Sequence, residues 1–169
     1  MSCHLLRLTH TATVEEFRED FEQLMAGHPE SLPWASTPEG LAEAIEVLKE
    51  AVPYLWLGKE DDKPVAALYM ELVLGDNGEN LAEIHGISAV GETKNPVKEA
   101  LLVSAINYMF NTAFVVAIIA HFDSQNKGAK GFCLKNGFTL VTTDEGLRYW
   151  YLDKERFEKI RDRFERVGQ

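Results

Sequence analysis

Glu83 and His85 are the two side chains in this sequence best placed to move a proton. They lie two positions apart in a strand-like run over 81–90, so strand alternation places both on the same face as Ile87. A carboxylate or an imidazole on that face could act as a general base and take a proton from a substrate, directly or through a water molecule. The alternative is that both are polar residues on a solvated or cleft-facing side of the strand.

Cys133 is a third candidate, in a segment that the spacing predicts as a short helix turning directly into a strand. Asn126 can cap the start of this helix, and Gly137 can adopt the left-handed conformation that ends it before Phe138. A thiol with an ordinary pKa of about 8.5 could donate a proton. The alternative, which we favour, is a small buried side chain that packs like an apolar residue.

Other polar clusters are weaker candidates. His121, Asp123 and Ser124 follow a predicted buried strand at its carboxyl end, a common position for ligand-binding residues in open α/β sheets. Three residues within four positions cannot easily fold back on one another as a catalytic triad does. The histidines are isolated from each other and the two cysteines are far apart, so the sequence predicts no metal site.

Hydrophobic periodicity predicts the elements that position these residues. We expect a strand, two helices, three strands, a buried helix, a strand, a short helix, two strands and a final helix. A capping box at Thr13 and Glu16 marks the first helix start, and Thr37 before Pro38 marks the second. The predicted ranges are 5–8, 13–27, 37–52, 54–59, 64–74, 81–90, 97–111, 114–120, 126–137, 139–142, 147–152 and 153–167.

Length and charge narrow the class of protein. A chain of 169 residues suits one domain over 1–169. The net charge of -10 argues against a nucleic-acid groove and favours basic partners or substrates. The apolar runs are too short for a membrane span, the N-terminus lacks a signal-peptide pattern, and two cysteines fit a reducing cytoplasm. The stripe on helix 153–167 predicts a docked helix or, alternatively, a homodimer contact.

The pattern Asn-x-x-Ala-x-x-aromatic-x-x-Lys-x-Gly-Phe over 126–138 resembles a segment of the GCN5-related N-acetyltransferase (GNAT) superfamily. The order of elements is similar over about 5–152, and the sequence detail over 81–138. The resemblance implies an α/β (α+β) fold with a mixed central sheet and helices on both faces, to which helix 153–167 is an addition. It also implies that acetyl-coenzyme A (acetyl-CoA) is the cofactor, with Asn126 and Ala129 beside its arm.

The resemblance further implies that the strand backbone at Ile87, Ser88 and Ala89 holds the pantetheine arm. The pyrophosphate would then meet the following helix start, whose free N–H groups and dipole favour anions. The residues there are Lys94, Asn95, Val97 and Lys98.

This stretch departs from the family pattern, because Lys94, Pro96 and Lys98 replace glycines and Thr93 replaces an arginine. Pro96 has no N–H to donate, whereas the lysines could supply point charges to a phosphate. Asn95 could instead cap the helix without any ligand. Cys133 likewise stands where the family often has a tyrosine that protonates the leaving thiolate.

Two functions therefore stay open. The first is an N-acetyltransferase that moves an acetyl group from acetyl-CoA to an amine of a small molecule or protein. The second is a catalytically inactive protein of the same fold with a binding or structural role. The degraded loop resembles that of small phage-encoded acetyltransferase-like proteins, which would place the chain in the host cytoplasm or the virion.

Overall fold

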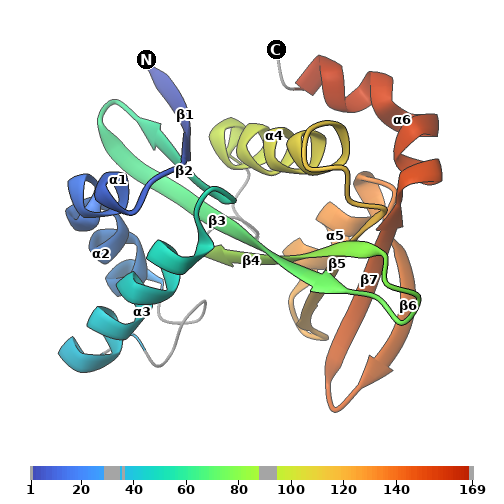
Figure 1. Cartoon of the computed structure of the whole chain (residues 1–169), viewed down its shortest axis with the longest axis horizontal. Coiled ribbons are helices and arrows are strands. Elements are labelled where there is room, and N and C mark those ends of the chain that lie inside the picture. Colours follow the sequence, from blue (N-terminus) through green and yellow to red (C-terminus); the bar gives the residue numbers. More distant parts are fainter. Residues whose placement is uncertain (1, 29–34, 36, 88–94, 168–169) are drawn as a thin grey trace. The chain divides into compact units, whose positions relative to one another are not determined.

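The computed structural model describes residues 2–28, 35, 37–87 and 95–167. These residues form one seven-stranded mixed sheet in the order β1-β2-β3-β4-β5-β7-β6, together with six helices. The strands are β1 Cys3–Leu8, β2 Leu55–Glu60, β3 Lys63–Leu74, β4 Asn80–Ile87, β5 Ala117–Asp123, β6 Thr139–Asp144 and β7 Leu147–Asp153. The helices are α1 Thr11–Glu16, α2 Arg18–Gly27, α3 Pro38–Ala51, α4 Pro96–Asn111, α5 Lys127–Lys135 and α6 Lys154–Val167. The predicted α/β class with a mixed sheet is confirmed (Figure 1).

The chain divides into two compact units. The first comprises Met1–Met70, His85–Ala89 and Asn95–Leu101, and the second comprises Glu71–Ile84, Val90–Lys94 and Leu102–Gln169. The prediction of a single domain over 1–169 stays a prediction.

In the first unit, helices α1, α2 and α3 lie side by side (blue to cyan in Figure 1). Their apolar faces bury Phe21, Met25 and Ile45 in a core with Leu8 and Leu57 from the strands. Helix α3 starts as predicted, because Pro38 is at its first turn and the Gly40 N–H donates to Thr37 Oγ1 at 3.1 Å. Strands β2 and β3 form the predicted hairpin, whose turn has positive φ at Asp61 and Asp62.

The start of the first helix was predicted wrongly. Helix α1 begins at Thr11 after His10, and Thr13 Oγ1 donates to the His10 carbonyl at 2.8 Å rather than capping a later start. The helical segment is also two helices, because Phe17 leaves the helical conformation at φ -102° and ψ 18°. The Phe17 N–H still donates to the Thr13 carbonyl, so helical backbone hydrogen bonding continues up to the break.

In the second unit, β5 runs parallel to β4 and antiparallel to β7, and β6 follows β7 as a hairpin partner. The parallel pairing of the strands on either side of α4 was predicted and is confirmed. Strand β5 begins at Ala117 rather than at Phe114, which has φ 55° and is 70% exposed. The three-residue shift places His121 and Asp123 inside the strand instead of after it.

Helix α5 has the predicted start and end. Asn126 Oδ1 accepts the Ala129 N–H at 3.0 Å. Gly137 has φ 81°, the Phe138 N–H donates to the Cys133 carbonyl at 2.9 Å, and the Gly137 N–H donates to the Leu134 carbonyl at 3.4 Å. These two bonds are those of a Schellman motif, which pairs the carbonyls at a helix end and turns the chain into β6.

Helix α6 docks through Phe157, which is 1% exposed and stacks on Phe110 of α4 with ring centroids 4.5 Å apart. Asp153 Oδ1 accepts the Arg156 N–H at 2.7 Å and caps the helix. The docked alternative is thus confirmed for Phe157, and the homodimer stays a prediction. Within the described part of the chain, none of the helices has the length and apolar character needed to cross a bilayer.

Candidate active site

The structure pairs Glu83 of β4 with His121 of β5. Glu83 is opposite Ile119 in the parallel register, so Glu83 and His121 share one face of the sheet. Glu83 Oε1 and His121 Nε2 are 2.6 Å apart, and the two side chains are 25% and 33% exposed. With Glu83 as a carboxylate, Nε2 donates and Oε1 accepts, because a carboxylate has no proton to give. Both side chains are therefore mostly buried but still accessible to solvent.

Tyr149 of β7 continues this row across the sheet. It is the antiparallel partner of His121, and the two rings are 5.6 Å apart between centroids, tilted by 33°. Three adjacent strands of the second unit therefore contribute one side chain each. No local pattern predicts this row, since Glu83 and His121 are 38 positions apart in the chain.

The predicted alternation along β4 is present. Ala82 and Ile84 are buried, whereas Glu83 and His85 are half-buried. The His85 ring stacks on Tyr69 of β3, with centroids 4.8 Å apart and planes 15° apart.

Asp123 and Ser124 do not join His121 as a triad. Asp123 Oδ1 accepts the backbone N–H of Gln125 at 2.8 Å, and the Ser124 N–H donates to the Gly146 carbonyl at 2.8 Å. Both residues therefore shape the turn after β5.

At the start of α4, two of the predicted cofactor-binding residues have structural roles. Asn95 Oδ1 accepts the Val97 N–H at 2.8 Å, so the predicted cap is confirmed. Val97 is 3% exposed and packs over β2, where its Cγ1 would lie 3.0 Å from a Cβ added to Gly58. Lys98 is half-buried on the same helix.

The remaining residues of the predicted loop are outside the described part of the chain. These are Ser88, Ala89 and Lys94, and for Ile87 only the strand backbone is described.

Cys133 is fully buried, at 0% exposure. Burial raises the pKa of its thiol from 9.0 to about 12, because a thiolate would lose its hydration. Ala129, one turn earlier, is also 0% exposed, and Asn126 caps the helix. These three residues of α5 therefore serve the helix and the core, which fits the packing role that we favour for Cys133.

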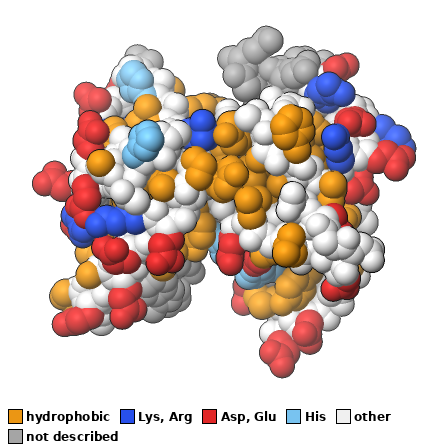
Figure 2. Space-filling model, in the orientation of Figure 1, with side chains coloured by type: hydrophobic (Ala, Val, Ile, Leu, Met, Phe, Trp, Pro, Cys, Tyr) orange, Lys and Arg blue, Asp and Glu red, His pale blue; other side chains and the backbone are white. Residues whose placement is uncertain are grey.

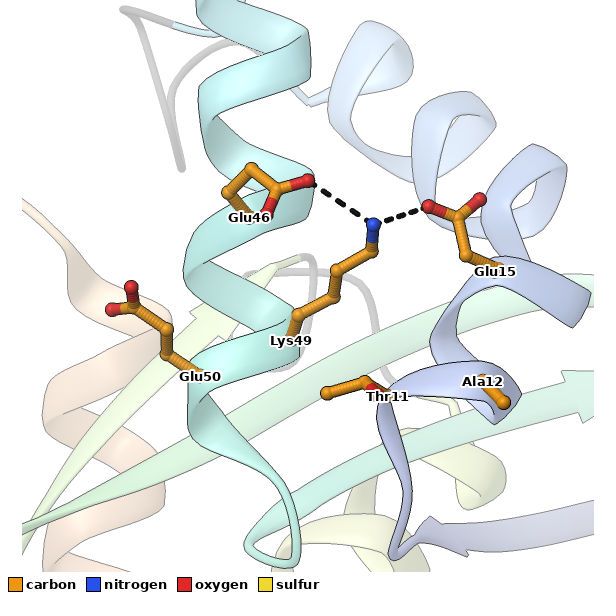
Figure 3. Close-up of a pocket in the computed structure, with 6 residues that line it drawn as sticks. All are labelled: Thr11, Ala12, Glu15, Glu46, Lys49 and Glu50. Carbon is orange, nitrogen blue, oxygen red and sulfur yellow. Dashed lines mark hydrogen bonds and ion pairs between the residues drawn. The ribbon is translucent and has the colours of Figure 1, made fainter.

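A depression with a volume of about 460 Å³ lies between α1 and α3 in the first unit. Figure 3 shows the Lys49 ammonium there between the carboxylates of Glu15 and Glu46. The Arg18 guanidinium, with help from Lys49, lowers the pKa of Glu15 to about 2. The depression contains none of the predicted site residues. The ion pair of Lys49 with Glu15 joins α3 to α1 there.

Comparison with solved structures supports the fold, whereas the two sequence comparisons found no match. No protein-family model matches the sequence, and no curated protein matches it either. The apo structure of FdhC, a nucleotide-linked sugar GNAT, is similar with a TM-score of 0.71 at 15% identity, covering 99% of this chain and 96% of that chain.

Two ligand-bound structures are also similar. The PaiA N-acetyltransferase of Thermoplasma acidophilum in complex with coenzyme A has a TM-score of 0.61 at 16% identity, covering 90% of this chain and 99% of its own. Campylobacter jejuni PseH in complex with acetyl coenzyme A has a TM-score of 0.53 at 17% identity, with coverage of 90% and 99%. The likeness extends over nearly the whole of each chain, and with it the predicted architecture is confirmed: this protein has the GNAT fold.

Proposed function

We propose that this protein is an N-acetyltransferase that moves an acetyl group from acetyl-CoA to an amine of a small molecule or protein. The observation that supports this most is Glu83, a half-buried carboxylate hydrogen-bonded to His121 on the face of β4 where a base is expected. Glu83 would accept the proton of the bound amine. The neutral amine nitrogen would then attack the thioester carbon, forming a C–N bond as the C–S bond breaks. The second proton lost by the nitrogen would pass to the sulfur, so that coenzyme A leaves as the thiol.

The charge of the protein favours a cationic acceptor. The net charge is -10, and acidic side chains are more widespread than basic ones on the face that Figure 2 shows. Such a field attracts amines that are protonated at neutral pH and speeds their encounter with the protein. We therefore propose a polyamine-like small molecule or a basic protein segment as the acceptor.

Glu83→Gln tests the proposal directly. The substitution removes the base but keeps the size of the side chain, so turnover should fall by about 10²–10⁴-fold. Acetyl transfer to a panel of cationic amines should be followed by mass spectrometry of the products. Glu43→Gln, a change at an exposed position of α3, is the matched control and should leave turnover unchanged. Equal turnover in the two variants would remove Glu83 from the mechanism.

A second function is favoured by the start of α4 and by Cys133. The Val97 N–H is already bonded to Asn95, Pro96 has no N–H, and the buried thiol is a poor acid. In this alternative the protein binds a partner without catalysis, as a virion-associated or host-interaction protein of a phage would. Calorimetry with acetyl-CoA separates the two, because an inactive binding protein would give no heat at millimolar ligand.

A further inference from the structure

We infer that His121 is a positioning residue that holds the Glu83 carboxylate in place for proton transfer. This inference rests on the proposed acetyltransferase function, which assigns Glu83 as the base. It concerns the second unit alone, because β5, β7 and the part of β4 that carries Glu83 all belong to it.

The backbone around His121 is well fixed. Seven consecutive pairs join β5 to β7, from Ala117 opposite Asp153 to Asp123 opposite Leu147. His121 is within this ladder, and the Tyr149 ring lies against its imidazole. A side chain with two rotatable bonds on such a strand has few orientations, so its Nε2–H points to a defined place.

The Glu83 side chain has more rotatable bonds than the side chain of His121. A glutamate side chain has three rotatable bonds and loses much rotamer freedom when it is fixed. The 2.6 Å bond from His121 Nε2 engages Oε1 and so fixes the carboxylate that would accept the proton of the amine. Placement of a base within about an ångström of the required position can change a rate by about 10²-fold. His121 therefore acts through Glu83, by holding its carboxylate in one orientation.

The substitutions His121→Gln and His121→Leu separate positioning from direct proton transfer. The glutamine amide can donate a hydrogen bond to Glu83 from nearly the place of Nε2, but it cannot take up a proton. Leucine can do neither. His4→Leu, at an exposed position of β1, is the matched control.

The expected result is a loss of about 10- to 100-fold in kcat for His121→Leu, while KM for acetyl-CoA stays unchanged. His121→Gln should recover most of that loss. Thermal melts of all variants check that folding is intact. If His121→Leu does not fold, the turnover of His121→Gln relative to wild type and to Glu83→Gln decides whether His121 positions the carboxylate. Full activity in His121→Leu would overturn the inference. An inactive but folded His121→Gln would overturn it too, because His121 would then carry the proton itself.

A second measurement distinguishes failure of this inference from failure of the proposed function. In protein labelled with ¹⁵N at histidine, the Nε2 signal of His121 should shift in Glu83→Gln, because the carboxylate acceptor is lost. If the wild type transfers no acetyl group to any amine while this shift is present, the proposed function fails and the pair is only a structural contact. If transfer is present and the shift is absent, the function stands and the positioning role is overturned.

Discussion

Burial separates the two kinds of candidate catalytic side chain in this protein. Glu83 is a quarter exposed and hydrogen-bonded to His121, so its carboxylate can meet both a substrate and an orienting group. Cys133 is fully enclosed, and its neutral thiol is the form that an apolar site favours. At the scale of single residues, the structure therefore supports a carboxylate base more strongly than a thiol acid.

The reactivity of the two cysteines should differ accordingly. A thiol reagent should label native protein at the exposed Cys3 and not at the buried Cys133, because only a reachable thiolate reacts. Mass spectrometry should find one adduct on the native chain and two in denaturant, with Cys3→Ser as the control that abolishes native labelling. Fast native labelling of Cys133, slowed by acetyl-CoA, would instead restore it as a candidate acid.

Helix ends decide much of the structure at the scale of elements. The caps at Thr37, Asn95, Asn126 and Asp153 each pair a side-chain oxygen with a backbone N–H of the helix that follows. Such bonds involve residues two or three positions apart and satisfy donors that have no partner inside the helix. They fix where α3, α4, α5 and α6 begin along the chain.

Gly137 should be the least replaceable glycine of α5 and its turn. Gly137 has φ 81°, and a Cβ added there would lie 2.5 Å from Ile160 Cδ1 of α6. We expect Gly137→Ala to destabilise the protein by about 1–3 kcal/mol, from the strained conformation together with the clash. Gly131→Ala, inside the same helix and in open space, should stabilise it by about 0.5–1 kcal/mol. Urea unfolding of both variants is the measurement, and equal effects would contradict the turn assignment.

The contacts of Glu15 that link α1 to α2 and α3 should be sensitive to acid. It accepts hydrogen bonds from Arg18 at 2.6 and 2.8 Å and contacts Lys49 of α3. The pKa of Glu15 falls from 4.5 to about 2 on folding, so this contribution is present above pH 4.5 and is lost as the pH falls towards 2.

Glu15→Gln should therefore be less stable than wild type at pH 7, and the difference should close between pH 4.5 and 2. Because the groups are partly exposed, added salt should also reduce it. Thermal melts across this pH range are the measurement, with Glu43→Gln as the exposed control on α3. A difference that is independent of pH would show that Glu15 acts through packing instead of charge.

At the scale of the whole molecule, this protein has the GNAT fold although its sequence is only 15–17% identical to those of FdhC, PaiA and PseH. A fold is set by patterns of burial and by turns, which many sequences satisfy, whereas chemistry depends on individual side chains. The acetyltransferase proposal therefore rests on Glu83 and on whether the protein takes up acetyl-CoA.

Binding of acetyl-CoA should raise the stability of the native protein. A ligand at 100 times its Kd adds about 2.7 kcal/mol to the free energy of unfolding. Removing Lys94 and Lys98 together, by substitution with alanine, should weaken binding, and salt should weaken it further in the wild type. Calorimetry and thermal shift are the measurements, with Lys63→Ala and Lys154→Ala together as the control at exposed positions. No heat and no thermal shift at millimolar ligand would favour the binding-protein alternative.

The sequence by itself determined the features that depend on near neighbours. The order of the strands, the caps at Thr37, Asn95 and Asn126, the turn at Gly137 and the alternation along β4 were all predicted, whereas the break at Phe17 that divides the first helix in two was not. Each depends on residues within a few positions or on a repeating pattern. The same local evidence failed at Thr13 and at Phe114, where a local hydrogen bond and a positive φ shifted the ends of the elements.

Only the tertiary structure decided which polar side chains meet. The pairing of Glu83 with His121 depends on the register between two parallel strands separated by a whole helix, and a shift of one residue would turn either side chain to the other face. The burial of Cys133 depends similarly on what packs around α5, which its own sequence does not specify. Long-range register and packing thus select, from several candidate residues, those that can act together.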